Sequence, residues 1–453
     1  MKKLIFVFSI ILYIVINVVG DLSDWENISV CLFVFFFLTF LQDLGNKIVI
    51  LDLTVIMACI TCLVMPVVFY HVYTKDNPLA RMWLKYMPVG SEEYFSFAVP
   101  AVVALAVGLK LPLLKLKYKN TPEVYMNNVK TYLKDNPKIG LMLIATGVLS
   151  GFLDFLAPAS LSEIFFLMAH LIFVGVFYVI YAPNKNKRVI VPGVILLMLG
   201  ESILTGMFGE LVFILACSLG IVLLGKRIKY RKKIVFAFLG LFVILLIQSI
   251  KGDYRKKSWG EGGGGDPLYF ASLIVDRIAT PSSMLNPQGL FVTSVRMNQG
   301  WLVAETMKMV PEKHSFGNGE PLLEAVAASV IPRFVWPDKP EAGGKANLKR
   351  FWGFNLVGWS TNIGTLGEAY ANFDRTGGIV YMFFYGIFFN LVLSIILKMA
   401  ERRATLILWL PYLFFSAIAV ETDLLSTMGA LVKSVIFSWL IFRLFRHAFH
   451  TEL

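Results

Sequence analysis

Apolar runs long enough to cross a lipid bilayer recur along most of the chain, separated by short polar segments. A membrane-spanning helix needs roughly 20 apolar residues, so runs of this kind predict transmembrane helices. We place these spans at residues 3–20, 28–42, 48–70, 93–114, 139–157, 161–182, 189–205, 207–225, 234–250, 379–398, 405–420 and 424–442. The pattern predicts an all-α integral membrane protein with about twelve transmembrane helices.

The membrane pattern stops between Lys251 and Gly378, where prolines, glycines and polar residues become frequent. This segment lies between the ninth and tenth predicted spans and is far too long for a simple turn. We therefore predict three parts. They are a bundle of nine spans at 1–250, a large external loop at 251–378, and three spans with a cytoplasmic tail at 379–453.

Composition excludes a soluble protein, because 57% of the 453 residues are hydrophobic and only 16% are charged. A soluble domain carries roughly a quarter charged residues. The net charge of +12 would fit a nucleic-acid partner, but the lysines and arginines cluster between the apolar runs, at 115–138, 185–188, 226–233 and 398–403. Positively charged connections stay in the cytoplasm, so membrane topology accounts for the charge and we expect no nucleic-acid partner.

Both termini are predicted to be cytoplasmic and the long loop external, because Lys2 and Lys3 hold the start of the chain inside. The assignment depends on residues 189–225, where the segment GESILTGMFGE interrupts an apolar stretch. We interpret this segment as a tight external hairpin. The alternative is a single long kinked helix, which would reverse the orientation of everything that follows.

Two stretches of the predicted loop, 268–280 and 288–310, have the pattern of amphipathic helices that lie against the membrane surface. They carry Arg277 and Arg296 among apolar neighbours. The apolar stretch 322–331 is too short to cross and predicts a re-entrant or interfacial helix. We expect Arg277 and Arg296 to contribute to the binding of a diphosphate.

Three prolines fix the backbone of the segment IPRFVWPDKPEAGG, residues 331–344, and present its charged side chains on a rigid extended loop. An arginine forms a planar fork that matches phosphate oxygens. The cations near this loop that we expect to bind a diphosphate are Arg333, Lys339, Lys345, Lys349 and Arg350. The alternative is that they contact anionic lipid headgroups.

Two residues of the predicted loop are candidate general bases. Glu368 lies in the polar run GEAYANFDRTGG near apolar walls, and a partly desolvated carboxylate accepts a proton more readily. His314 lies in a turn-rich break at 311–321. The alternatives are that Glu368 caps a helix or pairs with Arg375, and that His314 is an exposed turn residue. The loop contains no metal-ligand spacing, so no metal site is expected.

The long external loop, the IPRFVWPDKP segment with Arg333 and Gly344, and the GEAYANFDRTGG run resemble bacterial O-antigen polymerases of the Wzy type. An arginine and a glycine at such spacing form a motif of that family's external loops. The resemblance implies a membrane glycosyltransferase of the bacterial inner membrane, with its large loop in the periplasm. It would polymerise undecaprenyl-diphosphate-linked oligosaccharide repeat units, with membrane lipids as surroundings and a chain-length regulator protein as a possible partner.

Group transfer outside the cytoplasm has no supply of nucleotides, so we expect a preactivated substrate and no cofactor. The hypothesis is that Arg333 binds the donor diphosphate while Glu368 or His314 deprotonates the acceptor hydroxyl. Two other functions remain open. An O-antigen ligase would transfer the finished glycan to lipid A core, and a polysaccharide flippase or other transporter would need charged residues along a path through its spans.

Overall fold

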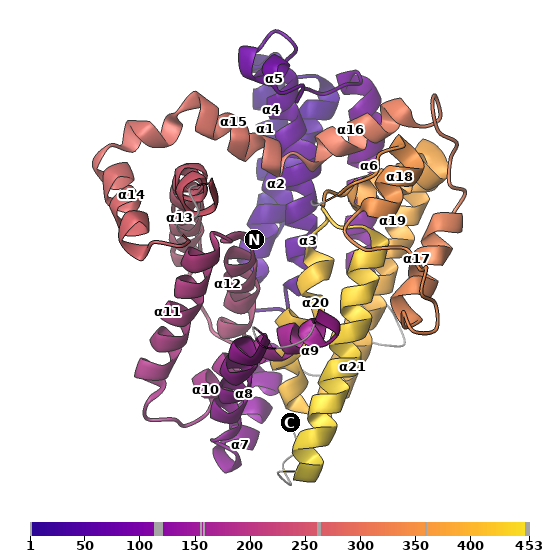
Figure 1. The fold of residues 1–453 in the computed structure, drawn as a ribbon. Helices are drawn as coiled ribbons and strands as arrows, with labels where there is room; N and C mark the ends of the chain where they lie inside the picture. The colour runs from indigo at the N-terminus through magenta and orange to yellow at the C-terminus, as the bar shows by residue number, and fades with distance from the viewer. Residues whose placement is uncertain are drawn as a thin grey trace.

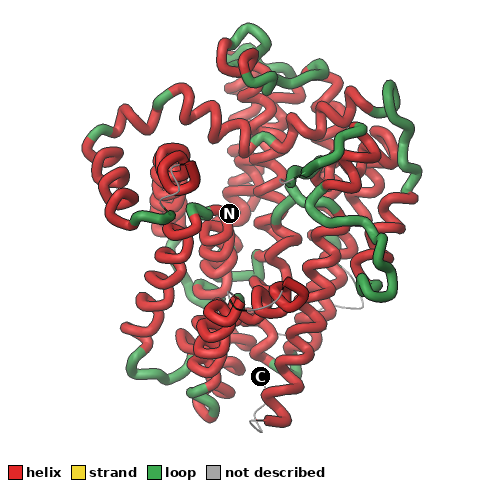
Figure 2. The backbone as a smooth tube through the Cα atoms, viewed as in Figure 1, coloured by secondary structure: helices red, strands yellow, loops and turns green. Residues whose placement is uncertain are grey.

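The computed structural model describes residues 2–112, 121–154, 156, 159–260, 264–357 and 360–448, and the regular elements in these ranges are helices (Figures 1 and 2). The first half contains α1 (Lys2–Val19), α2 (Asp24–Asp43), α3 (Ile50–Cys59), η1 (Ile60–Val64), α4 (Met65–His71), α5 (Pro78–Met82), α6 (Ser91–Lys110), α7 (Pro122–Asp135), α8 (Ile139–Asp154), α9 (Ala159–Ala169), α10 (Leu171–Tyr181), α11 (Lys187–Thr205) and α12 (Gly209–Val222). The second half contains α13 (Tyr230–Arg255), η2 (Lys256–Gly260), α14 (Pro267–Ala279), η3 (Pro281–Leu285), α15 (Pro287–Met297), α16 (Gln299–Met309), α17 (Glu320–Val330), α18 (Lys345–Trp352), α19 (Gly364–Ala400), η4 (Ala404–Trp409), α20 (Leu410–Ile418) and α21 (Leu424–Ala448). The predicted all-α class is confirmed.

Nine helical segments of the described residues are long and apolar enough to cross a membrane, or ten if α7 and α8, which meet at 84°, form one bent span. The chain is a multi-span helical membrane protein, and its described residues contain fewer candidate spans than the twelve predicted. The predicted spans at 139–157, 207–225 and 405–420 correspond to α8, α12 and the η4–α20 pair, which are shorter than a crossing helix. Hydropathy does not detect a local break in a helix. In the predicted span 405–420, a 3-10 helix precedes Pro411 and the α-helix that follows has only nine residues.

In the described residues of the segment 251–378 no large external loop is evident. Helix α13 continues to Arg255 and α19 begins at Gly364, so both membrane helices extend into it. Between them the described residues fold mainly into short helices, and the longest irregular stretches gather around α17 and α18 (Figure 2). Hydropathy marks the end of an apolar run, and a helix continues past that point wherever polar residues keep its hydrogen bonds.

The two predicted amphipathic stretches are helical, as expected. Residues 268–280 correspond to α14, whereas residues 288–310 are divided into α15 and α16. The division falls at Asn298, whose side-chain oxygen accepts the N–H of Trp301 and so caps the start of α16. The short apolar stretch at 322–331 is α17.

The predicted hairpin between α11 and α12 is confirmed. Helix α11 ends at Thr205, Gly206 takes a left-handed conformation with φ of 68°, and α12 begins at Gly209. A glycine in this conformation is a common helix terminator because it has no Cβ to clash with the backbone. The alternative of one long kinked helix is therefore excluded.

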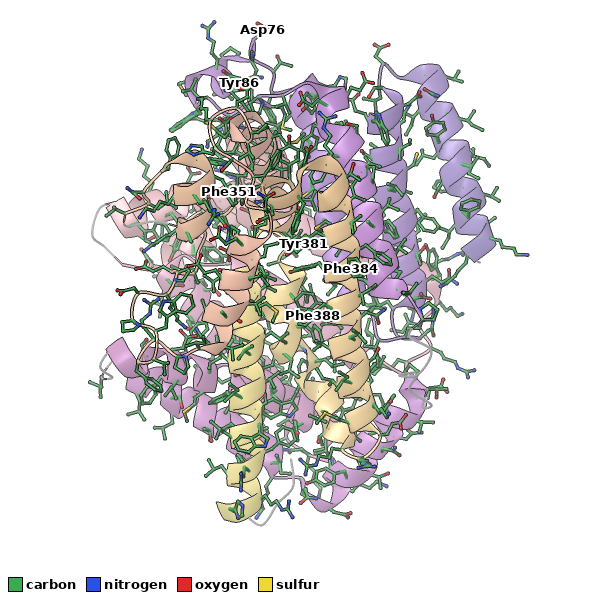
Figure 3. The ribbon with its side chains drawn as sticks, turned by 90° about the vertical axis from the view of Figure 1, so that its right-hand side faces the viewer. Asp76, Tyr86, Phe351, Tyr381, Phe384 and Phe388 are labelled. Atoms are coloured by element: carbon green, nitrogen blue, oxygen red, sulfur yellow. The ribbon has the colours of Figure 1, made fainter. Side chains whose placement is uncertain are left out.

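Helix α19 is interrupted by a kink at Asp374, where φ is 59° and ψ is −167°. Residues 364–372, before the kink, are buried in the protein. After the kink the helix runs down the bundle, and Figure 3 shows Tyr381, Phe384 and Phe388 along it. The Phe384 side chain is 60% exposed and faces outward, so this half of α19 has a surface for lipid.

Helices α6 and α19 approach each other so closely that only glycine fits at their contact. A Cβ added at Gly108 would meet the carbonyl oxygen of Phe383, and one added at Gly386 would lie 2.6 Å from the carbonyl oxygen of Leu105. Small residues at helix contacts are typical of membrane bundles, because they let the backbones pack closely. Asn390 adds a polar link by donating to the Gly108 oxygen at 3.0 Å.

We expect Gly386→Val to destabilise the protein, because the added methyl groups must push α19 away from α6. Overpacking of this kind costs about 1–3 kcal/mol. The matched control is Gly240→Val, since a Cβ at Gly240 on α13 meets no atom within 4 Å. Thermal unfolding of the two variants in detergent checks this: equal unfolding temperatures would contradict the close contact of α6 and α19.

Candidate functional site

A cavity of about 810 Å³ lies between α17, the segment 331–344, α18 and the first residues of α19 and α21. Its lining is rich in charge. The cations that line it are Arg333, Lys339, Lys345, Lys349 and Arg350. The acids that line it are Glu324, Asp338, Glu341, Glu368 and Asp423. The five cations are exposed or half-buried and share the rim with the exposed acids Glu324, Asp338 and Glu341, whereas Glu368 and Asp423 are buried.

Glu368 is held in place by two donors from different parts of the chain. Its side chain is in the buried first half of α19 and the residue is only 2% exposed. One carboxylate oxygen accepts from the side-chain amide of Asn347 on α18 at 2.9 Å, and the other accepts from the backbone N–H of Leu424 at 2.7 Å. Three segments that are distant in sequence therefore meet at this carboxylate.

Asp423 lies immediately before α21, is 1% exposed, and was not among the residues that the sequence singled out for chemistry. It accepts from the N–H of Ser426 at 2.8 Å, as a helix N-cap does, and from the N–H of Gly344 at 3.2 Å. In the sequence, Asp423 is recognisable as an aspartate directly before an apolar run, which predicts a helix N-cap. Its partner lies 79 positions away, and periodicity does not report contacts at such separations.

Gly344 has to be glycine for two reasons. Its φ of 81° lies in the left-handed region, and a Cβ there would collide with the carbonyl oxygen of Thr361. Gly343 precedes it with φ of 84°, and its N–H donates to the hydroxyl of Ser426 at 3.1 Å. The two glycines bring the backbone close enough to reach both Ser426 and Asp423.

The rim cations differ in how far they are engaged by the protein. Arg333 is exposed and donates to the carbonyl oxygen of Pro337 at 3.0 Å, which closes a turn of its own loop. Lys345 pairs with Glu341 at 2.6 Å, and Arg350 pairs with Glu320 at 2.7 Å. The donation from Lys345 holds the pKa of Glu341 below its usual range.

Lys339 has a mainly structural position. Its ammonium group donates to the carbonyl oxygens of Ala328 and Ile331, each at 2.7 Å, and so satisfies the C-terminal end of α17. Partial burial and the neighbouring charge of Arg333 lower the pKa of Lys339. This lysine fixes the loop to α17, which leaves Arg333 as the more accessible cation.

A family model described as a domain of unknown function, DUF8712, matches residues 97–449. The chain belongs to this family. The DUF8712 region starts within α6 and includes every residue of the cavity. Neither the curated proteins nor the solved structures contain a match to the chain.

Arg277 and Arg296 of the DUF8712 region do not line the cavity that Arg333 lines, so the structure does not bring the three arginines together there. Arg277 on α14 pairs with Asp253 of α13 at 2.6 Å, and Arg296 is exposed on α15. Figure 1 shows α14 on the opposite side of the molecule from α17 and α18. The sequence pattern placed these helices at the membrane surface but carried no information about which of them lie side by side.

His314 also lies apart from the cavity. It is half-buried in the turn between α16 and α17, where its ring would lie 3.4 Å from a Cβ added at Gly353, just past the end of α18. Glu368 does not pair with Arg375, because Arg375 binds Glu93 of α6 at 3.1 Å. Among the described residues no group of three or more His, Cys, Asp and Glu side chains could hold a metal ion.

Replacing Gly344 by alanine should disturb the cavity more than replacing its neighbour Gly343. Both positions have a positive φ, which costs about 1–2 kcal/mol for a residue with a Cβ. Only at Gly344 does the new methyl group also collide with the backbone of Thr361, whereas at Gly343 it meets Ser360 at 3.4 Å. Unfolding temperatures of purified Gly344→Ala and Gly343→Ala measure the difference, and the absence of a larger loss at Gly344 would disprove the close approach.

Proposed function

We propose that this protein polymerises undecaprenyl-diphosphate-linked oligosaccharide repeat units at the outer face of the bacterial inner membrane, with the cavity below α17 and α18 as its active site. The observation that carries the proposal is the pair of buried carboxylates, Glu368 and Asp423, in a cavity that is also lined by the exposed cations Arg333 and Lys349. A diphosphate-linked sugar needs both features. Cations stabilise the leaving diphosphate, and a carboxylate removes the proton from the attacking hydroxyl.

Arg333 is the residue to which we assign binding of the donor diphosphate. Its guanidinium is exposed at the cavity and uses one nitrogen, Nη1, for the Pro337 carbonyl, so its other N–H groups face solvent. Lys349 is exposed beside it on α18 and has no ion pair among the residues described. These two cations are therefore available to phosphate oxygens without breaking an existing ion pair.

Glu368 is the residue to which we assign the role of general base. In the transfer, the acceptor hydroxyl oxygen forms a bond to the anomeric carbon of the donor. The bond from that carbon to the diphosphate breaks, and undecaprenyl diphosphate leaves with the electron pair. The hydroxyl proton goes to Glu368, whose carboxylate lines the cavity, and no nucleotide is consumed.

The charge distribution supports an external location for this cavity. Helix α7 and the C-terminal end of α21 lie at one end of the bundle, and α16 and α18 lie at the other (Figure 1). The basic clusters at 185–188, 226–233 and 398–403 border the first of these ends. By the positive-inside rule we expect that end to be cytoplasmic and the cavity to open on the periplasmic side.

The direct test uses the purified protein in nanodiscs with the lipid-linked oligosaccharide of its own host, without nucleotide or added metal. Products are resolved by size. A ladder spaced by one repeat unit, with release of undecaprenyl diphosphate, is the expected result. Transfer of glycan to added lipid A core would instead identify a ligase, and no reaction with either acceptor would disprove glycosyl transfer.

Arg333→Ala should abolish the ladder while leaving the amount and the unfolding temperature of the protein unchanged. The reason is that this side chain is exposed and its loop is still held by Lys339. Arg81→Ala is the matched control, because Arg81 is also an exposed arginine but lies on α5, outside the cavity. A ladder of normal length from Arg333→Ala would rule out its proposed role.

Glu368→Gln should lower the initial rate by about 10²-fold or more without unfolding the protein. The new amide oxygen can accept from the N–H of Leu424, and the amide of Asn347 can turn so that its oxygen faces the new NH₂ group. Glu312→Gln, an exposed carboxylate outside the cavity, is the control. A Glu368→Gln protein with the wild-type rate would show that this carboxylate is only a structural anchor.

A further inference from the structure

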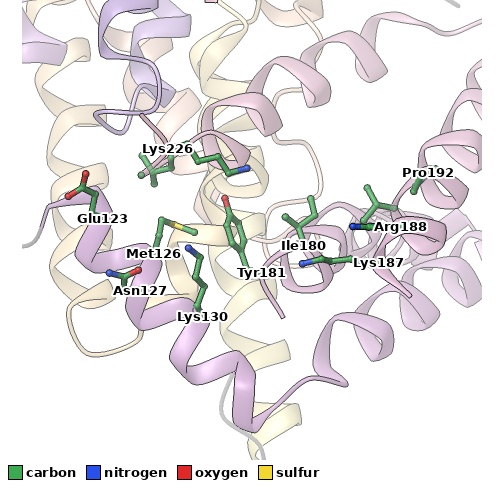
Figure 4. Close-up of a pocket in the computed structure, with 13 residues that line it drawn as sticks. Glu123, Met126, Asn127, Lys130, Ile180, Tyr181, Lys187, Arg188, Pro192 and Lys226 are labelled. Carbon is green, nitrogen blue, oxygen red and sulfur yellow. The ribbon is translucent and has the colours of Figure 1, made fainter. Parts of the chain in front are cut away.

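A second cavity, of about 750 Å³, lies at the opposite end of the bundle between α7, α10, α11 and the residues that follow α12 (Figure 4). None of the residues that line this cavity lines the first one. The two cavities are therefore separate sites. Tyr181 forms part of the wall and is fixed by its hydrogen bond to the Ile221 carbonyl at 2.8 Å.

Four cations from three parts of the chain surround this second cavity. They are Lys130 on α7, Lys187 and Arg188 on α11, and Lys226 after α12. All four are exposed, and none has an ion pair within the described part of the chain. Figure 4 shows them around Tyr181 and Ile180.

The acidic side chain of this lining, Glu123, does not neutralise the four cations. Its carboxylate lies 3.4 Å from Arg227, a fifth cation that does not line the cavity. The cations around the cavity therefore repel one another in the protein alone. Their convergence on one hollow raises the electrostatic potential there and favours an anion.

The start of α11 strengthens this potential. Lys187 and Arg188 occupy its first turn, which contains no acidic residue and has no side-chain cap. A helix N-terminus carries a partial positive charge and unpaired N–H groups, so basic residues there are unfavourable without an anion. The backbone N–H groups at the start of α11 and the side chains of Lys187 and Arg188 therefore both favour an anion at this point.

Helix α7, which borders this cavity, turns sharply away from the apolar helix that follows it. It meets α8 at 84°, and one of its faces, with Tyr125, Met126, Val129 and Leu133, is buried. The other face carries Asn127, Asn128, Lys130 and Lys134, which are exposed. A helix of this amphipathic kind is typical of the boundary between lipid headgroups and water.

We propose that this second cavity binds a phosphate-bearing anion, through Lys130, Lys187, Arg188 and Lys226, at the end of the bundle opposite the first cavity. The same chemistry is offered by a phospholipid headgroup and by a soluble phosphate compound, and the experiment separates these sources. The proposal does not depend on the glycosyltransferase reaction, because none of its residues lines the first cavity.

The test measures the thermal midpoint of the full-length protein in neutral detergent against added phosphatidylglycerol, phosphatidylcholine or inorganic pyrophosphate. The cavity variant carries Lys130→Gln, Lys187→Gln, Arg188→Gln and Lys226→Gln. The control variant carries Lys185→Gln, Lys229→Gln, Arg231→Gln and Lys232→Gln, which removes the same number of exposed charges without touching the cavity. Both sets lie near the same end of the bundle.

We expect phosphatidylglycerol to raise the midpoint of the wild type and of the control variant, with phosphatidylcholine giving no comparable rise. The cavity variant should need at least about tenfold more of the lipid for half of the effect, because it lacks the cations that hold the phosphate. Without ligand its midpoint should equal or exceed that of the wild type, since like charges have been removed. A rise with pyrophosphate would identify a soluble phosphate compound as the source.

The proposal is overturned if no phosphate-bearing compound raises the wild-type midpoint, or if cavity and control variants respond alike. The second result would mean that the total charge of this end, and not the cavity, attracts anions. A measurement on the wild type alone does not depend on the folding of any variant. Binding through four cations must weaken as the salt concentration rises, and binding that is indifferent to salt also overturns the proposal.

Discussion

The first cavity depends on two buried carboxylates that tie distant segments to the start of α21. The Asp423 carboxylate accepts a hydrogen bond from the N–H of Gly344. The Glu368 carboxylate accepts one from the side-chain amide of Asn347 and one from the N–H of Leu424. The proline-rich segment before Gly344 makes few regular hydrogen bonds of its own, so these contacts fix where it ends. A buried carboxylate is stable only when donors satisfy it, so the carboxylates and the segment they bind hold one another in place.

The position of Glu368 in turn depends on how α19 is held. Helix α19 packs closely on α6 at Gly108 and Gly386, and Arg375 pairs with Glu93 near the start of α6. Helix α6 therefore positions the carboxylate without touching it. Helix α19 therefore links the packing of the membrane helices to the position of the Glu368 carboxylate in the cavity.

Hydropathy was sufficient to predict the helical class, the long membrane helices and the α11–α12 hairpin, because each depends on the local sequence alone. It overcounted the spans, because apolar sequence continues through breaks such as the one before Pro411. The proline-rich segment that the sequence singled out, with Arg333, lines the cavity. Asp423 was missed, and Arg277 and Arg296 were grouped with Arg333, because the sequence pattern does not specify which helices are neighbours.

The kink at Asp374 gives α19 two environments in a single element. Residues 364–372 are buried, whereas Val380, Phe384 and Ile395 beyond the kink are exposed. Any apolar side chain of moderate size suits a surface that faces lipid, but an enclosed position accepts only a side chain of matching shape and polarity. Substitutions by other apolar residues should therefore be tolerated on the exposed face after Asp374, whereas residues 364–372 should accept few alternatives.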